Sequence, residues 1–281
     1  MTDANSLPAS PLCAAIDEWW DARDGLSPDN ADARKDVTGA LEALDDGSAR
    51  VAWVDPATDE VVVDERAKRA ILLSFKVFPM GDSSAGDFRY RDRMPLKTNF
   101  DGVRAVPGAV VRFGAYLAPG VVCMPSFVNV GGYVDGGSMV DTWATVGSCA
   151  QVGRNVHLSG GVGLGGVLEP PNAIPVVVED DAFVGSRSMV VDGARVGRGA
   201  KLGAGTILTA STHVVDANTG DEYLRGRIPP GAICVGSTRV KSFPGGDFGM
   251  PIVLVLRTLA ENEIHDKLVL NDVLREHGVS T

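Results

Sequence analysis

The chain has 281 residues, with 26 Lys and Arg against 36 Asp and Glu, so its formal net charge is −10 at pH 7. Nucleic-acid backbones and anionic membrane surfaces repel such a protein, which argues against both as its main partners. The composition is 44% hydrophobic and 22% charged. It excludes general disorder and indicates a folded protein with one large domain or two ordinary ones.

The N-terminal region predicts a small α+β cap. Residues 49–63 are typical of a hairpin with its turn at residues 55–59, and residues 67–78 form a further apolar segment. An earlier helix is indicated by apolar residues at helical spacing: Val37, Ala40, Leu41 and Leu44.

The location of the protein follows from the first residues and the cysteines. The first twenty residues are acidic and contain no basic segment followed by an apolar run, so we expect no signal peptide. The four cysteines are too widely spaced for a zinc knuckle or a dense disulfide framework. We therefore expect a cytoplasmic protein with reduced thiols and no metal site.

Glycine is in excess in the middle of the chain. There are 34 glycines, and 24 of them lie in residues 104–241. The same stretch has 11 basic and 10 acidic residues, a net charge of +1, whereas the flanks together carry −11.

The glycine-rich stretch contains a six-residue repeat. Nine hexads begin with a mostly aliphatic residue: Val110, Tyr116, Val122, Val128, Val134, Val140, Val146, Val152 and Leu158. Six more follow a first interruption at residues 166–175: Val178, Val184, Val190, Val196, Leu202 and Leu208. After a second interruption at residues 216–227 the repeat ends with Ile228 and Cys234.

A period of six fits neither an amphipathic helix nor an alternating strand. It is typical of a parallel β-helix, in which each hexad supplies a short strand with its aliphatic residue inward and a turn that tolerates glycine. We therefore predict three units: an N-terminal α+β cap domain over residues 1–103, a parallel β-helix catalytic domain over 104–241, and a C-terminal strand and helix over 242–281.

The C-terminal region predicts a cover for the end of the β-helix. Residues 252–256 are typical of a strand, and residues 258–277 of an amphipathic helix. Solenoids need such end caps. By analogy, hexapeptide β-helices are associated with acyl transfer from a thioester, and the grooves between the coils of a trimer suit an extended pantetheine arm.

Residues 124–188 resemble the tetrahydrodipicolinate N-succinyltransferase family, above all in DTWATVGSCAQ and NVHLSGGVGLGGVLEP. RAILLSFKV, VRAVPGAVVRFGAYLA and TGDEYLRGRIPPGAICVG extend the resemblance to roughly residues 40–240. The resemblance implies a left-handed β-helix, a homotrimer with active sites between subunits, and succinyl transfer from succinyl-CoA to the amine of L-2-amino-6-oxoheptanedioate in lysine and diaminopimelate synthesis. It implies no tightly bound cofactor, with acyl-CoA as cosubstrate.

Two residues match substrate-binding positions of that family. Asp141, in VDTWAT, matches its substrate-binding acid, and a carboxylate near the amine can accept or orient the proton that the amine must lose. We predict Asp141 as the catalytic residue, although a turn aspartate can also simply bond its own backbone. Arg104, in GVRAVP, matches the family's substrate-binding arginine, and a guanidinium suits a dicarboxylic substrate.

Further candidates rest on residue type and place. Glu169, on the first interruption, and Arg187 are candidates for substrate binding, with a solvated surface charge as the alternative for each. Candidates for binding CoA fall in two pairs: Ala204 and Gly205 through their backbone, and Arg239 and Lys241 through the phosphates. Their alternatives are turn residues and solvated charges. For His157 the resemblance implies a structural or indirect role.

One position departs from the family pattern. The segment VGSRSMVVDG has Met189 where the family usually has an active-site glutamate, and methionine cannot accept a proton. Either Asp141 works alone, or another carboxylate such as Glu169 replaces the glutamate, or the substrate differs. The alternatives to the succinyltransferase are a paralogue that uses acetyl-CoA or another amino-dicarboxylate, as in tabtoxin-type pathways, and a non-catalytic β-helix module.

Overall fold

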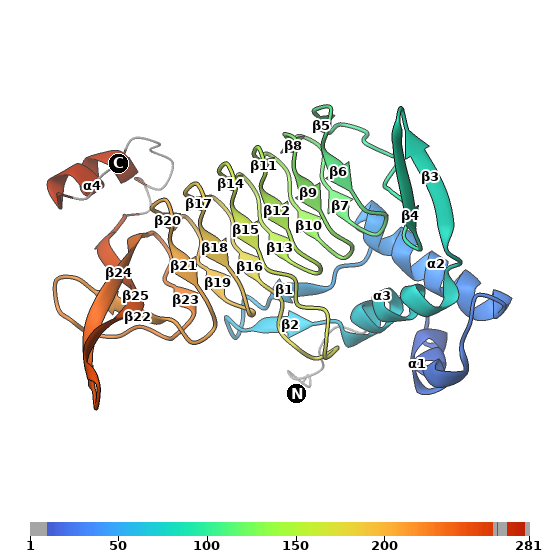
Figure 1. The fold of residues 1–281 in the computed structure, drawn as a ribbon, viewed down its shortest axis with the longest axis horizontal. Helices are drawn as coiled ribbons and strands as arrows, with labels where there is room; N and C mark the ends of the chain where they lie inside the picture. Colours follow the sequence, from blue (N-terminus) through green and yellow to red (C-terminus); the bar gives the residue numbers. More distant parts are fainter. Residues whose placement is uncertain (1–9, 261–262, 264–268, 279–281) are drawn as a thin grey trace.

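The fold is a long coil of short strands with a helical cap at one end and a hairpin and helix at the other (Figure 1). It is seen in a computed structural model that describes residues 10–260, 263 and 269–278. No helix in these ranges is long and apolar enough to cross a membrane.

The N-terminal cap contains the helix and the hairpin that the spacing predicted, and the apolar segment at residues 67–78 is mostly helical; the helix before residue 22 was not predicted. Its helices are α1 (Ala15–Asp21), α2 (Ala31–Asp46) and α3 (Glu65–Val77), with a 3₁₀ turn, η1 (Arg23–Gly25). The predicted hairpin is β1 (Ala52–Val54) paired with β2 (Val61–Val63). The α2 residues at helical spacing are buried, because they pack with α3 and with two coil residues, Val130 and Cys149, in one apolar cluster. The cap is therefore packed onto the coil.

A second hairpin, which the sequence analysis did not predict, joins the cap to the coil. It consists of β3 (Gly81–Ala85) and β4 (Phe88–Asp92). All five β4 side chains are exposed, so the segment has no buried face to leave an alternating apolar pattern.

The coil is a three-sided prism, each side a sheet of two-residue strands. The β7 sheet contains β7 (Tyr116–Leu117), β10 (Tyr133–Val134), β13 (Gln151–Val152), β16 (Val177–Val178), β19 (Arg195–Val196) and β23 (Arg227–Ile228). The β6 sheet contains β6 (Val110–Val111), β9 (Phe127–Val128), β12 (Thr145–Val146), β15 (Gly163–Leu164), β18 (Met189–Val190) and β21 (Ile207–Leu208). The β5 sheet begins with β5 (Arg104–Ala105), β8 (Val122–Cys123), β11 (Met139–Val140), β14 (His157–Leu158), β17 (Phe183–Val184) and β20 (Lys201–Leu202).

The parallel pairing confirms the repeat, and the inward positions are confirmed from Val128 onward. The first three predicted positions, Val110, Tyr116 and Val122, were wrong, because they are only half-buried. The residue after each is the buried one: Val111, Leu117 and Cys123. Two further inward positions, Leu164 and Val214, were not counted in the repeat.

The phase error has a local cause. The next inward residue after Cys123 is Val128, five positions on instead of six, so the turn between β8 and β9 is one residue short. The register shows the same change, since Val110 pairs with Phe127, 17 positions on, whereas Phe127 pairs with Thr145, 18 positions on.

The first interruption, residues 166–175, is held against the cap. Lys68 of α3 is fully buried, and its Nζ donates to the carbonyl oxygens of Pro170 at 3.1 Å and Ala173 at 2.7 Å. A buried ammonium must be hydrogen-bonded, and these carbonyls need donors, so the contact satisfies both partners.

The C-terminal region is more extended than predicted. β24 (Ala232–Phe243) continues past residue 241 and pairs antiparallel with β25 (Gly246–Thr258), which contains the predicted strand at 252–256. β25 also pairs with β22 (His213–Asp216), and both strands extend the β5 sheet. The helix expected over 258–277 was wrong at its start, because Thr258 ends β25. Residues 261–262 and 264–268 lie outside the described part, and α4 spans Val269–Glu276.

Candidate active site

The predicted acid lies at one edge of the prism. Where the β5 sheet meets the β6 sheet, four successive turns stack on one another; we call them the Asp141 corner, residues 141–144, 159–162, 185–188 and 203–206. Backbone hydrogen bonds join the stack: Gly161 donates to Thr142, Arg187 to Gly160, and Gly205 to Ser186. Four of the predicted residues fall on this corner: Asp141, Arg187, Ala204 and Gly205.

The Asp141 carboxylate is fixed by its own turn. Oδ1 accepts from the backbone N–H of Thr142 at 2.6 Å and lies 3.3 Å from the Thr142 hydroxyl. The Thr142 N–H, together with the His157 ring, holds the pKa of this carboxyl below its ordinary value, because both stabilise the charged form. Asp141 is therefore an anion at neutral pH, suited to orient an ammonium or amine.

His157 lies beside Asp141, at a place that the sequence analysis did not connect with it. Its Nε2 is 3.6 Å from Asp141 Oδ2, and its ring lies 5.4 Å from that of Phe183. The two residues come together because β11 and β14 are neighbours in the β5 sheet. The signal in the sequence was their spacing of 16 residues, nearly one full coil.

Arg104 and Arg187 lie on either side of Asp141 along the coil. Arg104 is on β5, two strands from β11, and Arg187 follows β17, two strands away in the other direction. Both are exposed. Within the described residues neither guanidinium forms a hydrogen bond or an ion pair, so both are available to an anionic ligand.

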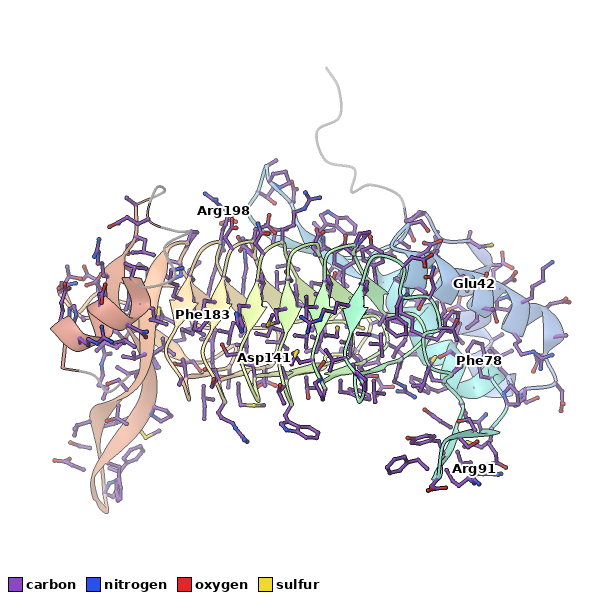
Figure 2. All side chains as sticks on the ribbon, turned by 90° about the horizontal axis from the view of Figure 1, so that it is seen from above. Glu42, Phe78, Arg91, Asp141, Phe183 and Arg198 are labelled. Carbon is purple, nitrogen blue, oxygen red and sulfur yellow. The ribbon has the colours of Figure 1, made fainter. Side chains whose placement is uncertain are left out.

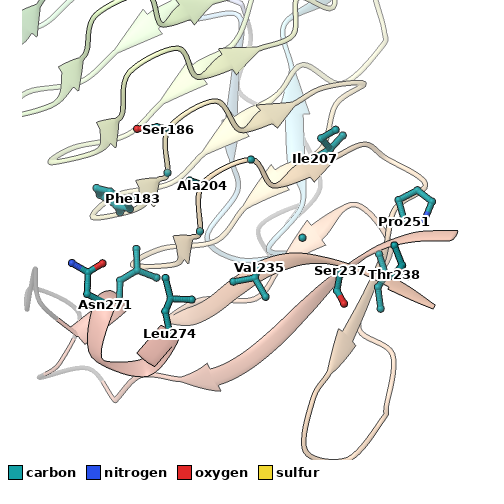
Figure 3. A pocket seen from close by; sticks show the side chains of 16 residues that line it. Phe183, Ser186, Ala204, Ile207, Val235, Ser237, Thr238, Pro251, Asn271 and Leu274 are labelled. Carbon is teal, nitrogen blue, oxygen red and sulfur yellow. The ribbon is translucent and has the colours of Figure 1, made fainter. Parts of the chain in front are cut away.

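A cavity continues from the corner toward the C-terminal end. Its volume is about 560 Å³, and its walls include Ala204 and Gly205 of the corner, Val235 of β24 and Leu274 of α4. Figure 3 shows the α4 side chains facing the turn that carries Ala204. A second cavity of about 670 Å³, which includes His157, shares Phe183, Leu270 and Asn271 with the first. The two cavities adjoin along the β5 sheet, and we call them together the groove; apolar atoms make up most of the wall of each.

Arg239 and Lys241 lie on the exposed part of β24. Arg239 Nη1 bonds Glu222 Oε1 at 2.6 Å, and Glu222 Oε2 also contacts His213 Nδ1 at 3.0 Å. Lys241 Nζ lies 5.3 Å from the ring centre of Phe243. Neither lines the groove.

Glu169 and Met189 do not lie at the Asp141 corner. Glu169 is exposed on the loop between β15 and β16, which is a different edge of the prism, and its cavity is shared with Asp192. Met189 is 39% exposed on the β6 sheet, with its sulfur over Gly163. In Figure 2, Asp141 and Phe183 lie along the coil away from Arg198, which marks another edge.

The buried cysteines offer no nucleophile. Burial raises the pKa of the Cys149 thiol to about 12 and that of Cys123 to about 11, so both are neutral thiols at pH 7. Among the described residues, no group of three or more His, Cys, Asp or Glu side chains is arranged to hold a metal ion.

Comparisons with known proteins agree with this architecture. The family model "Hexapeptide repeat of succinyl-transferase" matches residues 175–210 within the coil, which identifies the repeats there as hexapeptide repeats. The model "Tetrahydrodipicolinate N-succinyltransferase N-terminal" matches residues 11–77, the helical cap.

Two curated relatives match nearly the whole chain, and both are named 2,3,4,5-tetrahydropyridine-2,6-dicarboxylate N-succinyltransferase. The protein of Gluconobacter oxydans is 45% identical over 96% of this chain and 100% of its own length. That of Paramagnetospirillum magneticum is 46% identical over 93% and 97%. The chain belongs to the 2,3,4,5-tetrahydropyridine-2,6-dicarboxylate N-succinyltransferase family and is an acyltransferase.

Proposed function

We propose that the protein transfers the succinyl group of succinyl-CoA to the amine of L-2-amino-6-oxoheptanedioate, the ring-opened form of tetrahydrodipicolinate, in lysine and diaminopimelate synthesis. The observation that carries this proposal is the near full-length similarity to named succinyltransferases. An ionised Asp141 beside His157, which lines the second cavity, agrees with it.

In the proposed reaction Asp141 is the catalytic residue. Its Oδ2, which lies 3.6 Å from His157 Nε2, holds the acceptor amine, whose lone pair attacks the thioester carbonyl carbon. The C–N bond forms and the C–S bond breaks, so CoA leaves as a thiolate. The proton lost by the nitrogen neutralises the thiolate, so the products are the amide and free CoA.

The charged ends of the acceptor are assigned to arginines. Arg104 and Arg187 have no partner among the described residues, and each can bind a carboxylate through two N–H groups. Glu169 lies at another edge of the prism, so it can reach this site only from a neighbouring subunit.

The groove is assigned to the cosubstrate. A pantetheine arm is long, narrow and largely apolar, and the backbone at Ala204 and Gly205 can approach it closely, because these residues have small side chains or none. We assign the CoA phosphates to Arg239 and Lys241. A phosphate must compete with Glu222 for Arg239.

We infer that the protein is a homotrimer of left-handed β-helices, with active sites between subunits, in the cytoplasm. Large apolar side chains on and beside the Asp141 corner are exposed, with Trp143 at 73% and Ile207 at 57%, and a neighbouring chain would bury them. The free cysteines suit a reducing compartment. The predicted division at residues 103 and 241 remains part of this proposal.

A thiol-release assay tests the function directly. Purified protein is offered succinyl-CoA or acetyl-CoA together with L-2-amino-6-oxoheptanedioate, and free CoA is measured. We expect release with succinyl-CoA that depends on the acceptor. Release with acetyl-CoA alone would favour the paralogue, and no release with either donor would overturn the proposal.

Met189 gives a second test of the site. If a second carboxylate assists the transfer, Met189→Glu should raise the rate of succinyl transfer by roughly 10-fold, at the low end of general acid–base effects. The residue is 39% exposed, so the side chain can be accommodated. Met189→Gln, similar in size but uncharged, is the control. Equal rates in both variants would show that Asp141 works without a partner at this position.

A further inference from the structure

The Arg187 side chain lies across a glycine of the neighbouring turn. A Cβ placed on Gly161 would lie 2.7 Å from Cδ, 2.8 Å from Nε and 3.3 Å from Cζ of Arg187. Contacts below 3.0 Å do not occur between such atoms, so any side chain at position 161 must push the arginine aside. The guanidinium therefore lies over the turn of Gly161 and not over its own.

Gly161 lies between Arg187 and the catalytic turn. The turn that contains Gly161 follows strand β14, which pairs with β11 on one side and β17 on the other. Its N–H donates to the carbonyl of Thr142 at 2.8 Å, and the Arg187 N–H donates to Gly160 at 3.0 Å. The guanidinium is thereby brought to within about one strand spacing, ~4.8 Å along the coil axis, of the Asp141 turn.

This spacing fits an amine and a carboxylate on the same carbon atom. Each would be about 2.9 Å from its protein partner, the amine from Asp141 and the carboxylate from Arg187. Arg104 lies two strands beyond Asp141 on the opposite side, about 10 Å along the axis, and so faces the far end of a longer substrate.

We propose that Gly161 is a positioning residue for the acceptor: the absence of a side chain lets Arg187 bind the α-carboxylate beside the reacting amine, while Arg104 binds the distal carboxylate. The inference rests on the proposed function and deepens it. It limits the acceptors to α-amino acids that have a free α-carboxylate and a second carboxylate.

Gly161→Ala and Arg187→Gln test the proposal in the thiol-release assay. We expect each to raise the KM for the acceptor about 10-fold, with the KM for succinyl-CoA changed less than 2-fold. The double variant should be no worse than either single one, because both remove the same contact. Effects that multiply would mean that Gly161 acts only through its backbone.

Gly220→Ala is the matched control for backbone strain. Gly161 and Gly220 both have positive φ, +72° and +78°, but no atom lies within 4 Å of a Cβ at Gly220. The same strain without a displaced arginine should leave both KM values unchanged. An equal rise in the acceptor KM in this variant would overturn the assignment.

The acceptor itself provides a readout that folding defects cannot imitate. When the α-carboxylate is replaced by a carboxamide, the wild-type protein should lose at least 10-fold in kcat/KM, and Arg187→Gln should discriminate less than 2-fold. If the wild-type protein is active with L-2-amino-6-oxoheptanedioate, but the wild type and Arg187→Gln discriminate equally between the carboxylate and the carboxamide, this inference alone is overturned. If the wild-type protein is inactive with L-2-amino-6-oxoheptanedioate itself, the proposed function is overturned as well.

Discussion

At the residue scale, the Asp141 carboxylate has two contacts, one from its own turn and one from the neighbouring strand. Its turn provides the Thr142 N–H that holds the carboxylate, and its strand pairing brings His157 to 3.6 Å. An aspartate that only closes a turn needs the first contact and not the second. Asp135 also closes a turn: its Oδ1 accepts from Gly136 N–H at 2.7 Å, but its Oδ2 pairs with Arg154 Nε at 3.4 Å, and it lies on another edge of the prism.

This comparison defines a matched pair of variants. Asp141→Asn should lower kcat about 100-fold or more, because an amide cannot hold or accept the proton of the amine. Asp135→Asn makes the same chemical change at an equivalent turn and should keep the wild-type rate. Thiol release measures both, and circular dichroism checks that both are folded. A wild-type rate in Asp141→Asn would mean that another group handles the proton.

The lowered pKa of Asp141 also predicts how stability depends on pH. A carboxyl whose pKa is lower in the folded state than its ordinary value of 3.8 stabilises the fold above that value, and the contribution is lost as the pH falls through the folded pKa. The free energy of unfolding of Asp141→Asn should thus fall below wild type by about 1 kcal/mol at pH 7. Urea titrations at pH 7 and pH 3 should show this difference shrinking; a constant difference would contradict the assignment.

At the element scale, the loop at residues 166–175 shows how an interruption of the repeat becomes ordered. The loop leaves the coil between β15 and β16, yet it is tied to helix α3 by one buried lysine, about 100 residues away in sequence. A loop that simply extended into solvent would have no such contact. The backbone that carries Glu169 is therefore held by the cap as well as by the coil.

Lys68→Met should release this loop. The substitution removes the ammonium from both carbonyls; Pro170 keeps the Ala173 N–H as a donor, but the buried contact to Ala173 is lost, which costs about 1–3 kcal/mol of unfolding free energy. We expect hydrogen exchange at Ala173, whose N–H bonds Pro170, to accelerate at least 10-fold, with the coil amides unchanged. Lys76→Met is the control, because Lys76 is largely exposed and only faces Asp24 at 3.8 Å. Equal exchange in both variants would show that the lysine does not anchor the loop.

At the scale of the whole molecule, the net negative charge lies in other parts of the chain than the candidate active site. The net charge of −10 comes from the two ends of the chain, whereas residues 104–241 carry +1. The acidic ends repel long polyanions, but a small dicarboxylate or CoA meets a nearly neutral prism, on which Arg104 and Arg187 have no partner among the described residues. The same distribution lets three prisms approach one another without strong repulsion.

The proposed trimer has a simple test. Sedimentation equilibrium at micromolar concentration should give three times the chain mass of 29.4 kDa. Ile207→Glu should weaken assembly at least 10-fold, because it would bury a charge between subunits, whereas Leu224→Glu, on an exposed loop, should not. A monomer mass for the wild type would exclude sites shared between subunits.

The sequence by itself determined the β-helix, the two interruptions, and one helix and the first hairpin of the cap, and it supplied Asp141 as the candidate acid. A buried column repeats every six residues, and short-range spacing is enough to detect it. It also supplied Arg104 and Arg187 as candidates, from residue type and the family resemblance.

Only the tertiary structure decided which of these residues meet. Neighbours across coils are 17 or 18 positions apart in the uninterrupted part of the repeat, but 26 or 32 where a loop intervenes. One missing residue between Cys123 and Val128 shifts the phase of every coil before it. The pairing of His157 with Asp141 and the path of Arg187 over Gly161 depend on that stacking, as does the distance of Glu169 from both. Whether two residues of neighbouring coils meet depends on the lengths of all the turns between them, so no single segment of the sequence reveals it.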